Sequence, residues 1–367
     1  MPPVEAWEKV LVDADFVTST HGELGCRACH GGPDGVLEKD EAHQDVVADP
    51  SAGDAAVCQT CHATIVADVM KSLHATQQGY HTAFTARSGL PATDATYQQM
   101  FTARCATCHA TCGQCHVSRP VSVEGGLVSE HAFRKMPSQT ENCTACHGSR
   151  VGDEFRGRNS GVPEDVHYLN GMNCMSCHDD VELHGDGTTP TDRYHVEGGP
   201  ACATCHADAN SASASLIWHS AHAGKVACQV CHSESYKNCY SCHVQLDSQG
   251  LDFPSEMDFR IGRNPAPTTQ HPHDYVVVRH VPIVPDTFAA WDLELPDYAS
   301  VPTWRLATPH NIQKNTSQTE SCNTCHGSLD LFLTSAYIED LITSGLMVDD
   351  EVEANESVVV DEPPEMN

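Results

Sequence analysis

The stretch CATCHATCGQCH, residues 105–116, decides what kind of fold this chain adopts. It holds four cysteines and two histidines within twelve residues, and each cysteine pair is followed at once by a histidine. The same C-x-x-C-H unit accounts for all 20 cysteines of the chain. The ten units start at Cys26, Cys58, Cys105, Cys112, Cys143, Cys174, Cys202, Cys228, Cys239 and Cys322.

Other uses of paired cysteines fit this pattern poorly. Disulfides join cysteines at varied separations and need no histidine after the second cysteine. Structural zinc sites combine one C-x-x-C pair with a second pair or with more distant histidines, and a thioredoxin-like redox pair occurs once per domain. Histidine makes up only 24 of 367 residues, so its presence after all ten pairs is not accidental. The pattern predicts covalent attachment of c-type haem.

The chemistry of haem attachment explains the spacing. Two thiols add across the two vinyl groups of one haem, and the adjoining imidazole binds the iron from one face. We therefore expect ten haem c groups. The predicted thioether residues are Cys26, Cys29, Cys58, Cys61, Cys105, Cys108, Cys112, Cys115, Cys143, Cys146, Cys174, Cys177, Cys202, Cys205, Cys228, Cys231, Cys239, Cys242, Cys322 and Cys325. The predicted proximal iron ligands are His30, His62, His109, His116, His147, His178, His206, His232, His243 and His326. Within residues 105–116 we expect two macrocycles that almost touch.

The composition agrees with an interior built from porphyrin. A chain of 367 residues has room for two or three ordinary domains. Aromatic residues make up only 6% of it, however, and its mean hydropathy is −0.35, so side chains offer little material for several large cores. Haems would supply the missing apolar surface. The expected fold is a multihaem cytochrome c, with mostly short α-helices and long loops wrapped around a haem chain, and little β-structure.

Charge and hydropathy limit the partners and the location. The formal net charge of −30 argues against nucleic-acid binding. The many carboxylates are compatible with calcium binding, although no acidic loop spacing identifies a site. No apolar run is long enough for a transmembrane segment, and the first residues lack the features of a signal peptide. Because haem c is attached outside the cytoplasmic membrane, we expect an exported protein, extracellular, cell-surface or periplasmic, whose signal peptide is absent from this numbering.

Fourteen histidines outside the motifs are available as second axial ligands. His219 and His222 are three residues apart and so lie on one helical face. Which histidine serves which iron stays open, and His81, His271 and His273 are weaker candidates. Bis-histidine ligation favours low reduction potentials, whereas a methionine ligand would raise them. The ten predicted distal ligands are His21, His74, His131, His167, His184, His195, His219, His222, His280 and His310, with His43 in reserve.

The spacing of the motifs predicts four segments. Many gaps between motifs are near 30 residues, which suggests one-haem units in a row. The haem-free segment contains DYVVVRHVPIV, which predicts a β-rich element, and SAYIEDLITSGL predicts a helix close to the C-terminus. The final acidic residues are expected to be mobile. The segments are a nine-haem region at 1–243, a haem-free arm with axial histidines at 244–321, the tenth haem and a helix at 322–346, and an acidic tail at 347–367.

Several longer stretches resemble a known group of cytochromes. CATCHATCGQCHVSRP, CTACHGSRVGDEFRG, DVHYLNGMNCMSCH and VRHVPIVPDTF with PTWRLATPHNI are similar to the multihaem cytochrome c group related to hydroxylamine oxidoreductase and octahaem tetrathionate reductase. That group includes extracellular cytochromes of metal-respiring microbes. The resemblance covers roughly residues 20–330. It implies alternating parallel-stacked and T-shaped haem pairs, with His131, His167 and His184 among the sixth ligands.

The expected function is electron transfer along ten haems, in anaerobic extracellular respiration. The expected partners are other redox proteins, extracellular acceptors or copies of the same chain, and polymerisation into a filament is a hypothesis based on the composition of the arm and the tail. The alternative is an oxidoreductase of small nitrogen or sulfur compounds with one open-site haem. The group's reductases often replace one motif histidine by lysine, and no C-x-x-C-K occurs here. The sequence therefore favours electron transfer, and no catalytic residue is assigned.

Overall fold

The computed structural model describes residues 12–234 and 260–365. The predicted site residues Cys239, Cys242 and His243 lie outside these ranges. The chain packs into two compact units, each assembled from three separate segments. The first unit comprises Met1–Gln77, Ala106–Gly148 and Asp179–Pro190, and the second comprises Gln78–Cys105, Ser149–His178 and Thr191–Asn367.

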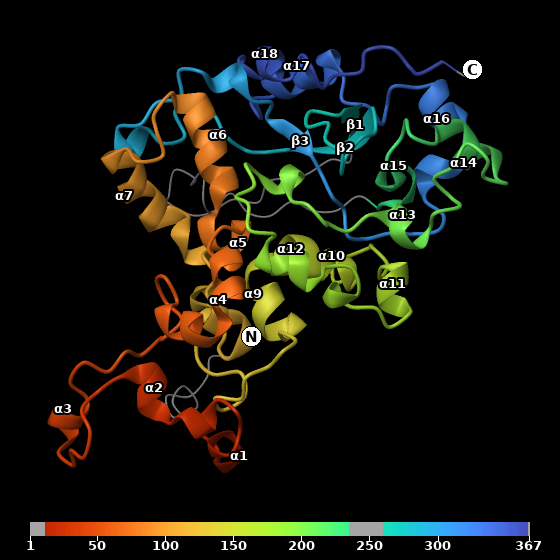
Figure 1. Ribbon diagram of the computed structural model, residues 1–367. Coiled ribbons are helices and arrows are strands. Elements are labelled where there is room, and N and C mark those ends of the chain that lie inside the picture. The colour runs from red at the N-terminus through yellow and green to blue at the C-terminus, as the bar shows by residue number, and fades with distance from the viewer. Residues whose placement is uncertain (1–11, 235–259, 366–367) are drawn as a thin grey trace. The chain divides into compact units, whose positions relative to one another are not determined.

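The described residues form mostly short helices and loops, as predicted (Figure 1). All the α-helices except α4, α6, α7 and α17 have six residues or fewer. The first unit contains α1 Ala14–Val17, α2 Cys26–His30, α3 Lys39–Ala42, α4 Ala56–Val69, α5 Leu73–Thr76, α8 Cys112–His116, α9 Thr144–His147 and α12 Asp180–His184. The second contains α6 Gln78–Ser88, α7 Ala95–Arg104, α10 Asp153–Phe155, α11 Val166–Leu169, α13 Cys202–Cys205, α14 Ile217–His222, α15 Cys228–His232, α16 Asn323–His326, α17 Ser335–Thr343 and α18 Glu351–Ala354. Isolated helices shorter than ~12–15 residues are marginal in water, so these need tertiary support.

Several C-x-x-C-H units form single helical turns. Helices α2, α8, α13 and α15 each begin at the first cysteine of a motif. Two side chains three residues apart on such a turn point to the same side, so the two thiols of a motif lie on one face.

Within the described residues, no helix is long and apolar enough to cross a membrane.

The predicted β-rich element is present in the second unit. Strands β1 (Arg260–Arg263), β2 (Tyr275–His280) and β3 (Trp304–Leu306) form an antiparallel sheet in the order β1-β2-β3. Val278 in the central strand pairs with Arg260 on one side and with Leu306 on the other. The run of β-branched valines favours this extended conformation, and its members are buried.

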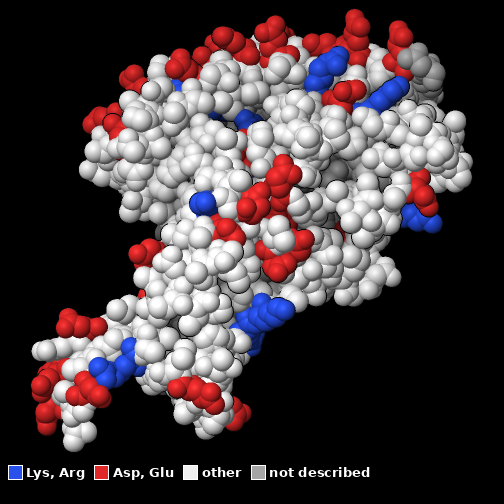
Figure 2. Space-filling model, in the orientation of Figure 1, with Lys and Arg blue, Asp and Glu red and all other residues white. Residues whose placement is uncertain are grey.

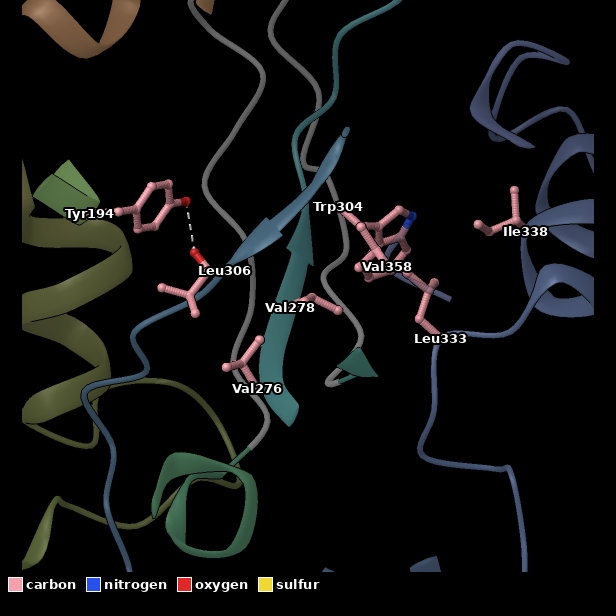
Figure 3. Packing of buried hydrophobic residues seen from close by; sticks show 8 residues of the cluster. All are labelled: Tyr194, Val276, Val278, Trp304, Leu306, Leu333, Ile338 and Val358. Atoms are coloured by element: carbon pink, nitrogen blue, oxygen red, sulfur yellow. Dashed lines mark hydrogen bonds between the residues drawn. The ribbon is translucent and has the colours of Figure 1, made fainter. Parts of the chain in front are cut away.

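A hydrophobic core packs around this sheet (Figure 3). Val278 of β2 and Trp304 of β3 meet Ile338 of α17 in the same cluster. The buried Tyr194 hydroxyl donates a 3.0 Å hydrogen bond to the carbonyl oxygen of Leu306. The second unit therefore contains a hydrophobic core that is built from side chains, few of which are aromatic. The cluster comprises Tyr194, Val276, Val278, Trp304, Leu306, Leu333, Ile338 and Val358.

The expectation of a mobile acidic tail is wrong for its described part. Val358 and Val360 are almost fully buried. The Arg263 backbone N–H donates to the Val358 carbonyl at 2.8 Å, and Val360 N–H donates to the Leu333 carbonyl at 2.8 Å. The valines thus hold the tail against the sheet, while acidic side chains gather on the surface above α17 and α18 (Figure 2).

A buried carboxylate fastens α18 to the sheet region. Glu351 is fully buried, and its Oε1 accepts hydrogen bonds from His280 Nε2 at 3.2 Å and from the Tyr298 hydroxyl at 2.7 Å. Thr303 and Asn355 donate to its other oxygen. Burial alone would raise the pKa of Glu351, but the hydrogen bond and charge of His280 and the hydroxyl donors outweigh it and lower that pKa.

We expect Glu351→Gln to destabilise the protein and to make its stability less sensitive to acidic pH. Breaking a buried charge pair costs about 3–5 kcal/mol, and the retained amide hydrogen bonds bring the expected loss to about 2–4 kcal/mol at neutral pH. Because the folded pKa of Glu351 lies below its unfolded value of about 4.3, its contribution is complete above that value and is lost as pH falls through the folded pKa. Thermal denaturation of both proteins from acidic to neutral pH measures this.

The matched control is Glu353→Gln, because Glu353 lies on the same helix and is exposed. Its effect should stay within about 0.5 kcal/mol. Equal losses for the two variants would contradict the assigned role of Glu351.

Candidate functional site: opposed histidine pairs

Eight of the nine described motif histidines face a histidine from outside the motifs. The ring centroids of these pairs are 5.9–6.3 Å apart. Each pair combines one motif histidine with one non-motif histidine, and each lies within a single unit. The pairs in the first unit are His62–His21, His30–His131, His147–His74 and His116–His184. Those in the second are His206–His167, His178–His310, His232–His219 and His326–His222.

The pairs connect segments that are distant in sequence. His178 follows the motif of Cys174, yet its partner His310 lies more than a hundred residues away in the predicted haem-free arm. Helix α14 presents His219 and His222 one turn apart, and these rings face His232 and His326 of two different motifs. A single six-residue helix therefore serves two pairs.

Backbone carbonyls orient several of the paired rings. Nδ1 of His30 lies 2.6 Å from the Val47 carbonyl oxygen, and Nδ1 of His116 lies 2.6 Å from that of Arg134. A carbonyl oxygen only accepts, so each Nδ1 carries the proton and Nε2 keeps its lone pair. Donation of the second ring nitrogen to a carbonyl is typical of metal-ligating histidines. In this arrangement Nε2 is the atom available to a metal.

The described part of the tail contributes one such carbonyl. Nδ1 of His326 donates to the Pro364 carbonyl oxygen at 2.7 Å. Sequence reasoning missed this role, because a backbone carbonyl carries no sequence signature. The tail therefore orients a motif histidine in addition to completing the core.

Local environment keeps two of the partner rings neutral. Burial, followed by the nearby His116, lowers the pKa of His184. Burial and the nearby His62 likewise lower the pKa of His21. A histidine binds metal in its neutral form, so both shifts favour ligation.

Two buried carboxylates organise the pairs of the second unit. Asp165 Oδ1 accepts from the backbone N–H of His167 at 2.7 Å, and Oδ2 accepts from Ile312 N–H at 2.6 Å. Glu154 Oε1 accepts from the backbone N–H of His310 at 3.0 Å, and burial raises the pKa of Glu154 to about 8. Asp165 thus ties α11 to the segment that carries His310.

Large apolar side chains surround the paired histidines and face outward. Leu169, Ile217 and Trp218 are 62%, 65% and 59% exposed, and each lies within two residues of a paired histidine. Phe133 is also exposed, and its ring stacks on His21 at 3.9 Å between centroids. Exposed apolar surface concentrated around these histidines indicates contact with an apolar partner.

The spacing of the paired rings fits one metal held between two imidazoles, as a haem iron would be. Two imidazole nitrogens that are each about 2.0–2.1 Å from one metal place their ring centres roughly 6.3 Å apart, since each ring centre lies about 1.1 Å behind its nitrogen. The observed separations of 5.9–6.3 Å match this value. Within residues 12–234 and 260–365, no three His, Cys, Asp or Glu side chains form a group that could hold a metal ion. The described cysteines are not joined in disulfides, as attachment to vinyl groups would require.

Two of the predicted distal ligands lie outside the eight pairs. His280 Nε2 contacts the buried carboxylate of Glu351 at 3.2 Å, a contact that supports the fold. His195 Nδ1 contacts Asp192 Oδ1 at 2.8 Å, and its ring is in none of the eight pairs. The reserve candidate His43 is exposed and is also in none of them, although its Nδ1 donates to the Lys39 carbonyl at 2.6 Å.

One described motif histidine, His109, belongs to none of the eight pairs. Its neighbour Ala110 donates a backbone hydrogen bond of 3.0 Å to the His74 carbonyl, which places His109 beside the His74–His147 pair.

Comparison with protein-family models, curated proteins and solved structures finds no match to this chain.

We expect Asp165→Ala to cost about 2–4 kcal/mol of stability. The substitution removes the N-cap of α11, worth about 0.5–2 kcal/mol, and leaves the half-buried Ile312 N–H without its acceptor, which costs about 1–3 kcal/mol. Denaturant unfolding measures the loss. Asp179→Ala is the control, because Asp179 caps α12 with a single exposed hydrogen bond to Glu182 N–H. Its loss should be near 1 kcal/mol, and equal losses would contradict the linking role of Asp165.

Proposed function

We propose that this chain is an exported multihaem c-type cytochrome that transfers electrons along ten covalently attached haems. The observation that carries the proposal is the set of eight opposed histidine pairs, each joining a motif histidine to a histidine from elsewhere in the chain. The motif pattern alone predicts attachment. The pairs add a second ligand from the opposite side.

The roles of the residues follow from this arrangement. The two thiols of each motif would hold one porphyrin edge, the motif histidine would bind the iron, and the partner histidine would bind it from the other face. A bound haem c supplies reversible one-electron chemistry at its iron. Carbonyls such as those of Val47 and Arg134 fix the imidazole orientation and raise its basicity.

Double histidine ligation favours electron transfer over substrate chemistry. Both axial positions of an iron between two histidines are filled, so the eight pairs offer no position to a substrate. Two histidines also keep the reduction potential low. These features favour a conduit, with other redox proteins, extracellular acceptors or further copies of the chain as partners.

The export of the protein is part of the same proposal. Covalent haem attachment takes place outside the cytoplasmic membrane, so a chain that carries haem c acts there. The formal charge of −30 keeps such a protein soluble and favours partners with basic surfaces.

Mass spectrometry and EPR of the native protein test the proposal together. We expect a mass that corresponds to ten attached haems, and ferric signals that are dominated by low-spin iron. A bare polypeptide would contradict the proposal outright. A substantial high-spin ferric signal would favour the oxidoreductase with an open site.

We expect His310→Ala to convert one haem from low spin to high spin, because it removes the ligand that faces His178. The potential of that haem should rise. His280→Ala is the matched control, since His280 lies in the same part of the chain but contacts Glu351. It should lower stability and leave the spin state unchanged. Identical spectra for both variants would refute the assignment of His310.

A further inference from the structure

Thiols of different motifs lie close together at three places. In the first unit, Cys58 lies close enough to Cys112 for their thiols to interact, and the same holds for Cys108 and Cys146. In the second unit, it holds for Cys202 and Cys228. Each contact joins two motifs, and the motifs joined are not always consecutive in sequence. The motifs are named below by their histidines, so these contacts link the His62 and His116 sites, the His109 and His147 sites, and the His206 and His232 sites.

Looser thiol neighbours connect these contacts into two rows. In the first unit, Cys29 lies near enough to Cys58 to interact electrostatically, and Cys115 likewise interacts with Cys146. In the second unit, the same holds for Cys177 with Cys202 and for Cys231 with Cys325. Closer thiol pairs therefore alternate with looser ones along each row.

Contacts that do not involve thiol pairs support the row in the first unit. The 3₁₀ turn Val121–Val123 contacts both the turn Ala106–Cys108 and helix α9, so it bridges the His109 and His147 sites. Ser122 Oγ within it lies 3.4 Å from Cys146 Sγ. At the other end of the row, Phe16 packs against both His131 and Phe133, and Phe133 stacks on His21. These rings join the partner of His30 to the partner of His62.

Shared elements support the row in the second unit in the same way. Helix α14 carries the partners of both His232 and His326. The 3₁₀ turn Ser317–Thr319 contacts both α15 and α16, and the neighbouring Thr316 hydroxyl donates to the Cys231 carbonyl. The His232 and His326 sites are therefore neighbours, although the motif of Cys239 lies between them in sequence.

We infer that the haem sites of the described residues run in the order His30, His62, His116, His147, His109 in the first unit, and His178, His206, His232, His326 in the second; the His243 site lies outside these residues. The inference rests on the proposed function and specifies the order in which electrons would pass between the haems. The two motifs within residues 105–116 are then not consecutive along the path, because the His147 site lies between the His116 and His109 sites. A row of haem sites in this order would therefore not follow the order of the motifs in the sequence.

The physical consequence is that the His147 site is an internal junction of its row. Its neighbours are the two sites whose attachment points are closest in sequence. Loss of the haem at this site should affect both neighbours, whereas loss of the haem at His30 should affect only the His62 site.

A cryo-EM map of the native, haem-loaded protein tests the order directly. We expect the iron of the His109 site to lie nearer to that of the His147 site than to that of the His116 site. We also expect the irons of the His232 and His326 sites to be adjacent. A shorter distance between the His109 and His116 irons would overturn the inference. A map with ten irons in another order refutes the order alone, whereas a map without haem refutes the proposed function.

A redox titration monitored by EPR gives a second test in solution. The variant Cys143→Ala/Cys146→Ala removes the internal site, and Cys26→Ala/Cys29→Ala removes the terminal one. Relative to the wild type, we expect the internal variant to shift the potentials of two remaining haems and the terminal variant to shift one. One shifted potential in both variants would overturn the internal position of the His147 site. The map of the wild-type protein decides the matter if either variant fails to fold.

Discussion

The opposition of two imidazoles, one from a motif and one from a distant segment, is the constraint on which the rest of the structure depends. Most helices here are too short to persist in isolation. A pair such as His178–His310 joins segments more than a hundred residues apart, and closing such a loop is entropically costly. Under the proposed function, an iron between the rings would supply that closure, because metal-binding free energy is also folding free energy.

The two units differ in how far they depend on this constraint. The second unit holds a small sheet, the Trp304 core and the Glu351 network, which are stabilised by ordinary burial and hydrogen bonding. Large apolar side chains face outward beside paired histidines in both units, for example Phe133 in the first and Trp218 in the second. We infer that porphyrin would cover such surfaces, and that the sheet and its core make the second unit less dependent on bound haem.

The mostly helical fold could be predicted from the sequence, because each C-x-x-C-H motif is a local pattern. Eight of the ten distal histidines chosen from sequence lie in pairs, but their pairing was not predictable. His131 lies close to Cys143 in sequence and yet faces His30, since the path of the chain decides which rings meet. His280 was chosen because it is a histidine in a haem-free arm, and only the structure places a buried carboxylate beside it. The burial of the valines in the tail could not be predicted either, because acidic residues surround them in the sequence.

Iron K-edge X-ray absorption of the native protein tests the central claim most directly, because it reports the atoms bound to the metal. The account predicts iron with six nitrogen neighbours at nearly every site, four from porphyrin and two from histidine. Sulfur neighbours bound to the metal, or zinc in place of iron, would contradict it.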